Sequence, residues 1–365
     1  MFCMIKKLHL KNFKCFECVD VEMSNLNVLT GINGMGKSTI MQSILLLIQS
    51  AKDLQVHGQV LLNGEYVKLG NGKDVLYEAA EDDSEIVISV ETTEQEKEFR
   101  FQYEAYSNVL RLFERQEDIL DFCAEERNVY LSAYRIPPAE IYSITNDTDL
   151  KNRNFGADGL YALQYLKEYG PKPLQNVGIC GNRTDNTLYE QVRKWMNEIA
   201  PGVSIEIEVD TEKRLALLGY SFVEGKNRTN TYNCVNVGFG ITYVLPVVVA
   251  LLSAKEGDLI LLENPEAHIH PAGQRKLGEL IALVANCGVQ IIVETHSDHI
   301  LNGIRIAVKN KMVRKEEVNL LYFYKDEKDG FKHKYESPEI NEDGRINKWP
   351  RGFFDAWEDA LLELL

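Results

Sequence analysis

Four residues near the start of the chain have the types and the spacing of a phosphate-binding loop. Gly31, Gly36, Lys37 and Ser38 satisfy the pattern G-x-x-x-x-G-K-[ST]. Glycines let consecutive backbone N–H groups turn onto phosphate oxygens, the lysine reaches the outer phosphates, and the serine hydroxyl can bind magnesium. An apolar run precedes the segment and a helical pattern follows it, so we predict strand, phosphate loop and helix. The expected ATP-binding residues are Lys14, Gly31, Asn33, Gly34, Gly36, Lys37, Ser38 and Thr39.

A phosphate loop needs an acidic partner on another strand to hold magnesium. The segment LILLENPE, residues 259 to 266, is an apolar run that ends in acidic and polar side chains. Glu263, at the end of the run, would bind magnesium directly or through water. Glu266 lies three residues further on and could orient the attacking water. A strand followed by a carboxylate is common on its own, and the phosphate loop upstream favours the functional interpretation.

A histidine follows the next buried run. The segment VQIIVET leads into His296 and Ser297. A histidine just past such a strand can contact the γ-phosphate and stabilise developing charge. Lone histidines are usually structural, but the position of His296 one strand after the carboxylates favours a catalytic role.

Two other patterns look like metal sites, and we favour neither. Glu266, His268 and His270 follow a nucleotide-binding strand so closely that we expect them to shape a loop at a dimer interface instead of binding zinc. Cys15 and Cys18 form a CxxC, but their surroundings alternate like a strand, which would direct the thiols to opposite faces. The seven scattered cysteines do not suggest a disulfide framework.

The elements that position these residues are predicted from apolar periodicity. IKKLHLKNF and LNVLT are expected strands, residues 38–51 a helix, 56–115 an antiparallel β-meander, and 128–138 a strand that ends at two prolines. Residues 139–200 are expected to be mainly helical, followed by a hairpin of SIEIEVD and LALLGYSFVE and a helix from residue 240 to 252. DLILLE, VQIIVET and NLLYFYKD then alternate with two helical segments.

Buried runs that alternate with helices indicate a mostly parallel sheet flanked by helices. The fold class is therefore α/β, a P-loop NTPase of ABC-ATPase type with an antiparallel β-meander and a helical insertion. We expect four segments: residues 1–138 and 231–325 as two halves of the ATPase core, 139–230 as a mixed helical insertion, and 326–365 as a C-terminal tail.

The order of these motifs resembles the ATPase heads of the ABC/SMC/RecF group. IKKLHLKNFKCF, GINGMGKST, VNVGFG, LLENPEAHIHP and VETHSDHIL carry the resemblance, which is closer still to the small AAA-type ATPases related to the overcoming-lysogenization-defect (OLD) family of anti-phage defence. It implies a degenerate signature loop at Val235 to Gly240, in which Gly238 and Gly240 meet the γ-phosphate bound to a second subunit. It also places Arg135 near the nucleotide or the magnesium waters, in a role like that of a Q-loop.

Two positions depart from the pattern of these ATPases. Glu263 replaces the usual metal-binding aspartate, and Asn264 stands where a catalytic glutamate is usual. Glutamate can still reach a metal, but asparagine is not a base. Either Glu266 takes that role, or hydrolysis is slow and the protein is a nucleotide-gated switch. We favour slow hydrolysis assisted by Glu266, with ATP and magnesium as cofactors.

Composition and charge limit the possible partners. No apolar run is long enough for a membrane span and the N-terminal residues lack a signal core, so a cytoplasmic protein without membrane contacts is expected. The resemblance implies a homodimer around two ATP molecules that controls an effector encoded nearby, which we expect to be a nuclease. The alternative is a RecF-like or SMC-like ATPase acting directly on DNA, although the net charge of −15 argues against a generally basic surface. A transporter subunit is a weaker third interpretation, because the signature loop is poor.

The C-terminal tail contains an aromatic cluster. Trp349, Phe353, Phe354 and Trp357 are expected to form a packing stripe that docks the tail, with a partner-binding surface as the second choice.

Overall fold

A computed structural model describes residues 3–81, 83–115, 121–123, 127–180, 185–225, 227–326, 329–330, 332–350, 352–354 and 364. The chain divides into two compact units. The first unit consists of Met1–Asn128, Val318–Glu339 and Ile346–Leu365, and the second of Val129–Glu317 and Ile340–Arg345. Across the described residues, no helix is both long and apolar enough to cross a membrane.

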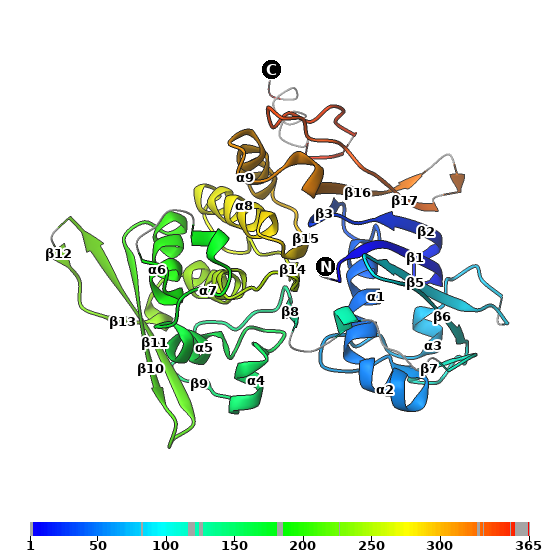
Figure 1. Ribbon diagram of the computed structural model, residues 1–365, viewed down its shortest axis with the longest axis horizontal. Helices are drawn as coiled ribbons and strands as arrows, with labels where there is room; N and C mark the ends of the chain where they lie inside the picture. The colour runs from blue at the N-terminus through cyan, green and yellow to red at the C-terminus, as the bar shows by residue number, and fades with distance from the viewer. Residues whose placement is uncertain are drawn as a thin grey trace. The chain divides into compact units, whose positions relative to one another are not determined.

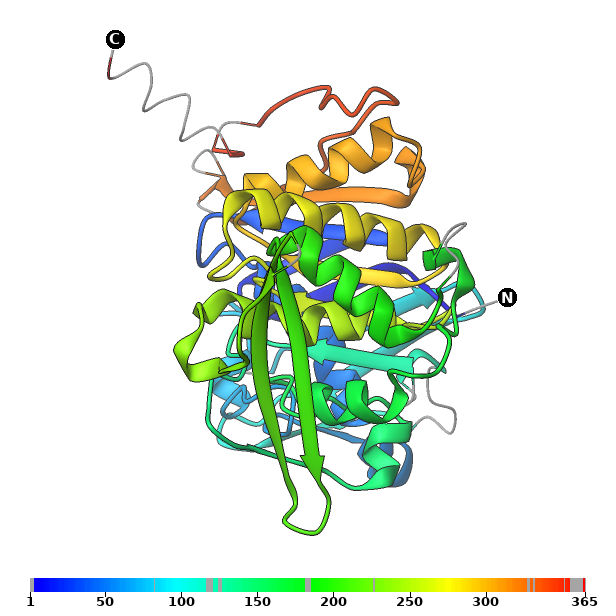
Figure 2. The same ribbon diagram turned by 90° about the vertical axis from the view of Figure 1, so that its left-hand side faces the viewer.

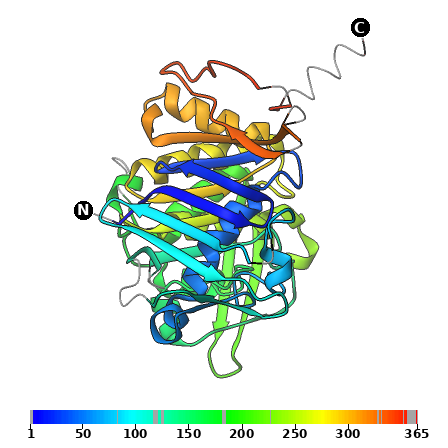
Figure 3. The same ribbon diagram turned by 90° about the vertical axis from the view of Figure 1, so that its right-hand side faces the viewer.

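An antiparallel sheet with the order β2-β1-β5-β6-β7-β4 forms much of the first unit (Figures 1 and 3). Its strands are β1 (Ile5–Phe13), β2 (Phe16–Glu22), β4 (Gln59–Leu61), β5 (Ile86–Thr92), β6 (Glu96–Gln102) and β7 (Val109–Leu112). Alternation along β1 buries Ile5, Leu8 and Leu10 and turns the residues between them outward. Strand β1 therefore has one face on the core and one that is more exposed, whereas β5 is buried from Ile86 to Val90.

The phosphate loop lies in the same unit, between β3 (Leu26–Gly31) and α1 (Lys37–Gln49). Strand β16 (Val318–Asp326) pairs in parallel with β3 and antiparallel with β17 (Lys332–Glu336). The unit also contains α2 (Ala51–His57), α3 (Gly72–Val75) and the 3₁₀ turn η1 (Asp121–Cys123). Strand β16, which is distant in sequence, therefore lies beside the strand that leads into the phosphate loop.

The second unit has a parallel pair of buried strands, β14 (Leu259–Glu263) and β15 (Gln290–Glu294). Their pairing puts Glu263 opposite Glu294, so both strands end at the same edge. Strand β8 (Asn128–Leu131) lies on the other side of β14. The helices around these strands are α7 (Phe239–Leu252), α8 (Pro271–Asn286) and α9 (Asp298–Lys309), with α8 and α9 side by side (Figures 1 and 2).

The rest of the second unit is a helical layer with a long hairpin. The hairpin consists of β10 (Val203–Asp210) and β11 (Leu215–Glu224), and it packs against α5 (Ala162–Tyr169) and α6 (Leu188–Ile199) (Figure 2). The remaining elements are β9 (Tyr142–Ser143), α4 (Asp147–Lys151), β12 (Asn227–Arg228), β13 (Tyr232–Asn233), and the 3₁₀ turns η3 (Val177–Cys180), η4 (Cys234–Asn236) and η5 (Lys315–Glu317).

The structure corrects several element predictions. The first 30 residues contain three strands, because Lys14 has φ 54° and the chain turns there into β2. The predicted β-meander does not start at residue 56, since α2 extends to His57 and only a short β4 follows. The predicted strand from 128 to 138 ends at Leu131, and β17 after β16 was missed. The four predicted segment boundaries stay a prediction.

The tail aromatics pack as a cluster where the structure describes them. Phe353 is 1% exposed and lies 5.5 Å from the ring of Tyr322 and 5.3 Å from Trp349. Phe354 lies 5.0 Å from Phe353. Trp357 lies outside the described residues. Phe353 therefore packs the tail against Tyr322 of β16, as a packing stripe would.

A buried ion pair fixes the start of β14 within the second unit. The Nη1 of Arg153 lies 2.6 Å from the Oδ2 of Asp258, and the two side chains are 1% and 3% exposed. Arg153 also donates to the carbonyl of Ser253, which follows α7. The pair thus joins the helical layer to the strand that leads to Glu263.

We predict that Asp258→Asn strongly destabilises the second unit. The substitution leaves the Arg153 guanidinium buried without its counter-charge, which typically costs about 3–5 kcal/mol. Urea unfolding followed by circular dichroism measures the change in the free energy of unfolding. Glu190→Gln is the control, because its ion pair with Arg193 is largely exposed. Equal unfolding midpoints for the two variants would contradict the prediction.

Candidate active site

The phosphate loop has a backbone that only glycines can form at two of its positions. Gly31 and Gly36 have φ 131° and 106°. A Cβ on Gly31 would lie 2.2 Å from the carbonyl oxygen of Phe323, and one on Gly36 would lie 2.5 Å from the ring of Phe16. Both the dihedral angle and the lack of space therefore explain why the motif has glycine here.

Lys37 lies across the first half of this loop. Its side chain is buried, and its Nζ donates to the carbonyls of Gly31 at 2.9 Å and Ile32 at 3.0 Å. Lys37 and Ser38 open α1, whose N-terminal N–H groups favour an anion. The structure thus brings the predicted lysine, serine and loop backbone together at one helix end.

The other predicted loop residues differ in their surroundings. Asn33 and Gly34 are exposed, whereas Thr39 is buried with its Oγ1 3.5 Å from the Cys15 Sγ. The Nζ of Lys14 donates to the Oε1 of Gln42 on α1 at 2.7 Å. Burial lowers the pKa of Lys14. Lys14 therefore packs beside the helix that follows the loop.

The carboxylate of Glu263 is held at the end of β14 by two donors. The hydroxyl of Tyr130 donates to its Oε1 at 3.0 Å, and the N–H of Ala133 donates to its Oε2 at 3.2 Å. Burial, followed by the charge of Glu263, raises the pKa of Tyr130, so the phenol remains a proton donor. The orientation of Glu263 is thus fixed by the strand and turn at residues 130 to 133.

Arg135 hydrogen-bonds to backbone carbonyls around this strand end. Its Nη1 donates to Ser132 at 2.8 Å and to Glu263 at 2.7 Å, and its Nη2 donates to Asn264 at 2.6 Å. The Nε donates to the carbonyl of Tyr243 on α7 at 3.2 Å. One guanidinium therefore joins a turn, the end of β14 and the first turns of α7.

The charge of Arg135 is maintained although the side chain is 3% exposed. Burial lowers its pKa to about 10, so the guanidinium stays protonated at neutral pH. The ring of Tyr243 lies 5.2 Å from it, within the range of a cation–π contact. The dipoles of the carbonyls and this ring replace part of the lost hydration.

Glu266 connects this strand end to the segment that follows β15. Its Oε1 accepts a hydrogen bond from the backbone N–H of His296 at 2.9 Å. Burial raises the pKa of Glu266. Its Oε2 and the Oδ1 of Asn264 are buried and have no hydrogen-bond partner among the residues that the structure describes. Ser297 caps α9, which fixes the chain just past His296.

The predicted signature loop leads into α7. Gly238 is exposed and is the N-cap of α7, whereas a Cβ on Gly240 would lie 2.1 Å from the carbonyl oxygen of His268. The His268 ring lies 5.1 Å from Phe239 and 5.0 Å from Tyr243. This close packing joins the start of α7 to the loop that follows Glu266.

Two models of known families match the parts of the chain that contain the phosphate loop and the strand end at Glu263. Residues 4–169 match the model described as "AAA ATPase domain", and residues 140–302 match "AAA domain, putative AbiEii toxin, Type IV TA system". The chain has the domains of an AAA-type ATPase. Residues 313–364 of this ATPase match a family described as "Protein of unknown function".

Solved structures of SMC head domains have a similar fold, and one curated nuclease has a short stretch of similar sequence. The Smc head domain of Pyrococcus furiosus, solved with an extended coiled coil and bound to a domain of ScpA, has a TM-score of 0.52 at 13% identity, covering 99% of each chain. The SMC head domain of Thermotoga maritima gives 0.46 at 13% identity, covering 92% of this chain and 99% of that one. The first confirms the predicted P-loop α/β fold.

The OLD nuclease of Thermus scotoductus is 42% identical over 45 residues. The match covers 12% of this chain and only 8% of that nuclease.

Both predicted magnesium ligands have the oxygen donors that magnesium prefers. Ser38 in the first unit carries a hydroxyl, and Glu263 in the second unit carries a carboxylate. Each oxygen of Glu263 accepts one hydrogen bond, from Tyr130 or from Ala133, and retains a lone pair for a metal or its water. The buried Oε2 of Glu266 adds an acceptor for a metal-bound water.

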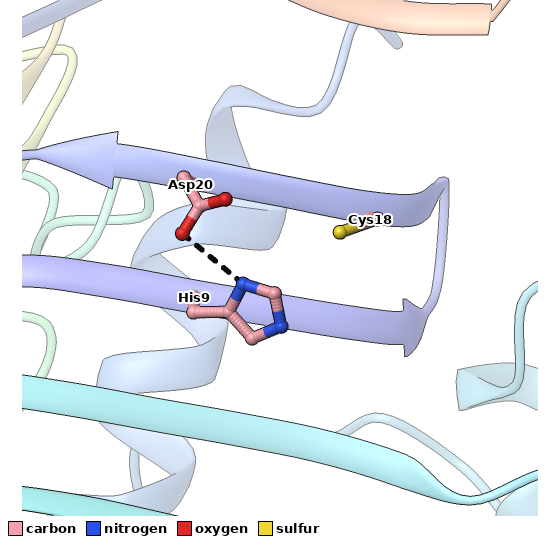
Figure 4. Close-up of side chains that lie close together, drawn as sticks. All are labelled: His9, Cys18 and Asp20. Atoms are coloured by element: carbon pink, nitrogen blue, oxygen red, sulfur yellow. Dashed lines mark hydrogen bonds and ion pairs between the residues drawn. The ribbon is translucent and has the colours of Figure 1, made fainter.

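The three residues of the possible zinc pattern have surroundings of other kinds. Glu266 is buried, the His268 ring packs on aromatic side chains, and the Nδ1 of His270 accepts the N–H of Ala272 at the start of α8. Within the described ranges, the one His/Cys/acid cluster with metal-ligand spacing is His9, Cys18 and Asp20 on β1 and β2 (Figure 4). Its carboxylate already contacts His9 and the Nζ of Lys7. Cys15 is half-buried beside Thr39, so the two thiols of the CxxC have different surroundings.

Sequence reasoning missed Tyr130 and Tyr243. Tyr130 holds Glu263, and Tyr243 contributes a carbonyl and a ring to the Arg135 site. Both tyrosines fall within an apolar strand or helix pattern, where an aromatic residue predicts only core packing. A pairing between distant segments leaves no local signal.

We predict that Arg135→Lys slows ATP hydrolysis at least about tenfold and changes ATP binding little. An ammonium cannot span four carbonyls, and losing hydrogen bonds from a charged group costs about 1.5–3 kcal/mol. Steady-state hydrolysis and nucleotide titration measure the two effects separately. Arg193→Lys is the control, because Arg193 is exposed on α6. A parental hydrolysis rate in Arg135→Lys would refute this role.

Proposed function

We propose that this AAA-type ATPase hydrolyses ATP slowly, closes into a homodimer around ATP and thereby controls a separate effector protein, a nuclease, in bacterial defence against phage. The general ATPase assignment rests on the two family matches. The slow rate, the dimer and the effector are proposals that go beyond them.

The placement of Glu266 carries the hydrolytic part of the proposal. Its carboxylate is buried, is held through Oε1 by the N–H of His296, and keeps Oε2 without a partner among the described residues. Such an oxygen can accept a hydrogen bond, and then a proton, from a water that attacks the γ-phosphate. His296, fixed at the same carboxylate, would stabilise charge on the phosphate. Magnesium, held by Ser38 and Glu263, would neutralise phosphate charge when bound.

The identity of residue 264 supports slow turnover. Asn264 occupies the position next to Glu263, with φ 42° and a buried Oδ1, but an amide cannot accept a proton from water. In this proposal Glu266 is the carboxylate that does so, and one of its oxygens already accepts the N–H of His296. Because only the other oxygen can accept a proton, the attacking water has fewer orientations that lead to hydrolysis, and turnover is slow.

The start of α7 supports a dimer closed by ATP. The N-cap Gly238 is exposed and leaves the helix N-terminus accessible to an anion. Val235 and Phe239 beside it are 42% and 44% exposed. An exposed helix N-terminus with apolar neighbours suits contact with the γ-phosphate and surface of a second copy.

Control of an effector is favoured over direct DNA binding. The net charge is −15, and three of the basic side chains have acidic partners: Lys7 contacts Asp20, Arg314 contacts Glu317, and Lys315 lies 3.9 Å from Glu342. These pairs reduce the charge available to phosphates. The short similarity to an OLD nuclease supports a nuclease as the effector class. Hydrolysis stimulated by DNA, with a steep salt dependence, would instead favour an ATPase that acts on DNA.

Lys37→Ala should weaken ATP binding roughly 10- to 100-fold, because it removes the charged donor of the phosphate loop. Isothermal titration calorimetry with ATP and magnesium measures the affinity. Lys52→Ala is the matched control, since Lys52 is an exposed lysine on α2. Unchanged affinity in Lys37→Ala would show that this loop is not the nucleotide site.

Glu266→Gln should reduce hydrolysis about 100-fold or more and accumulate an ATP-bound dimer. The amide keeps the size of the side chain but cannot accept the proton. Single-turnover hydrolysis measures the rate, and light scattering with ATP measures the dimer, with Glu168→Gln on the exposed face of α5 as control. Parental hydrolysis in Glu266→Gln would overturn the assignment of the base, and a monomer would overturn the dimer.

The parental pH profile provides a second readout of the same assignment. Burial raises the pKa of Glu266 above its ordinary value of 4.5, and a base works only when ionised. Hydrolysis should therefore be lost on acidification at a pH above 4.5, and the residual activity of Glu266→Gln should lack this step.

A further inference from the structure

A histidine near the C-terminal end contacts the tip of the phosphate loop. His333 lies on β17, and its Nε2 is 3.2 Å from the carbonyl oxygen of Gly34. A carbonyl oxygen can only accept a hydrogen bond, so the proton of this bond must be on the histidine nitrogen. The Gly34 carbonyl is thus directed toward β17.

This contact has a consequence for the next N–H group in the loop. In a trans peptide, the C=O of one residue and the N–H of the following residue point in opposite directions. Holding the Gly34 carbonyl toward β17 therefore directs the N–H of Met35 away from it. Phosphate loops bind their anion through such backbone N–H groups. His333 is not a phosphate ligand in this arrangement, but it fixes the orientation of one peptide of the loop.

The position of His333 is itself fixed within the first unit. Strand β17 pairs with β16, with His333 opposite Lys325. The Tyr335 hydroxyl donates to the carbonyl of Asp20 on β2 at 2.6 Å, and the Lys332 Nζ lies 2.6 Å from Glu17. The imidazole also packs edge-on against Phe16 at 6.2 Å. Strand β17 is thus attached to β2 on both sides of the histidine.

His333 is a neutral donor at neutral pH. Burial, followed by the charge of Lys325, lowers the pKa of His333, while backbone groups of Gly34 and Cys15 oppose the shift. The contact therefore supplies one N–H and not a permanent positive charge. This distinguishes it from Lys37, which carries the charge of the loop.

We propose that His333 is a positioning residue that sets the affinity of the phosphate loop for ATP by holding the Gly34–Met35 peptide. The hairpin of β16 and β17 lies within residues 313–364, which match a family of unknown function. The inference gives this part of the chain a role in nucleotide binding. It rests on the loop being the nucleotide site and is independent of dimerisation and of the effector.

The test compares three variants of the full chain. ATP affinity with magnesium is measured by calorimetry, and KM and kcat by steady-state hydrolysis. His333→Ala should weaken ATP binding about tenfold, equivalent to about 1.4 kcal/mol, and raise KM with little change in kcat. His333→Gln retains an N–H donor at a similar reach and should stay within about threefold of the parent. His333→Phe keeps a ring against Phe16 without a donor and should resemble His333→Ala.

The controls separate the hydrogen bond from hairpin packing. Lys332→Ala removes only the ion pair to Glu17, and Tyr335→Phe removes the bond to Asp20, so both should bind ATP like the parent. Parental affinity in both His333→Ala and His333→Phe would overturn the proposal. So would a loss in His333→Gln equal to that in His333→Ala, because the donor would then be irrelevant. Failure of the nucleotide site itself is distinguished by Lys37→Ala, which would also leave affinity unchanged.

Discussion

Arg135 brings a positive charge into the interior of the second unit, where its hydrogen bonds go to four backbone carbonyls. Desolvating a guanidinium is costly, so the carbonyls must remain in place around it. They belong to the turn after β8, to the end of β14 and to α7. The candidate catalytic residues therefore depend on a cation that contacts the backbone and leaves the carboxylates free to act.

Fixing the backbone in this way permits variation in the side chains. The carbonyls of residues 263 and 264 bind Arg135 whichever side chains they carry. The strand end therefore keeps these hydrogen bonds with Glu at position 263 and Asn at position 264, and it would also keep them with Asp and Glu there. Asn264 also has a φ of 42°, which asparagine tolerates better than most residues. A change of side chain at either position would therefore alter the chemistry of the strand end and keep these backbone hydrogen bonds.

The sequence allowed prediction of the phosphate loop, of β14 and β15, and of the helices after them. These elements have strong local signals: glycine spacing, buried apolar runs and helical periodicity. Strand β2 was missed because the turn into it depends on left-handed backbone at two non-glycine residues, Asn12 and Lys14. The resemblance singled out Arg135, but its contact with the Tyr243 carbonyl and the contact of His333 with Gly34 could not be predicted, since each joins segments more than 100 residues apart. Such contacts arise from topology, which composition and spacing do not encode locally.

Both units use the same physical device at their functional segments. In the first, the N–H of His333 holds the Gly34 carbonyl; in the second, Arg135 holds those of Glu263 and Asn264. Holding a carbonyl determines where the adjacent peptide N–H points, because the peptide is planar. Phosphate binding needs directed N–H groups, and the proposed role of Glu266 in hydrolysis needs the chain after β14 to be fixed. If Glu266 is the only base, the rate depends on one buried carboxylate, while the affinity depends on backbone orientation set elsewhere. Binding and hydrolysis can then change independently, which is the property that a nucleotide-gated switch requires.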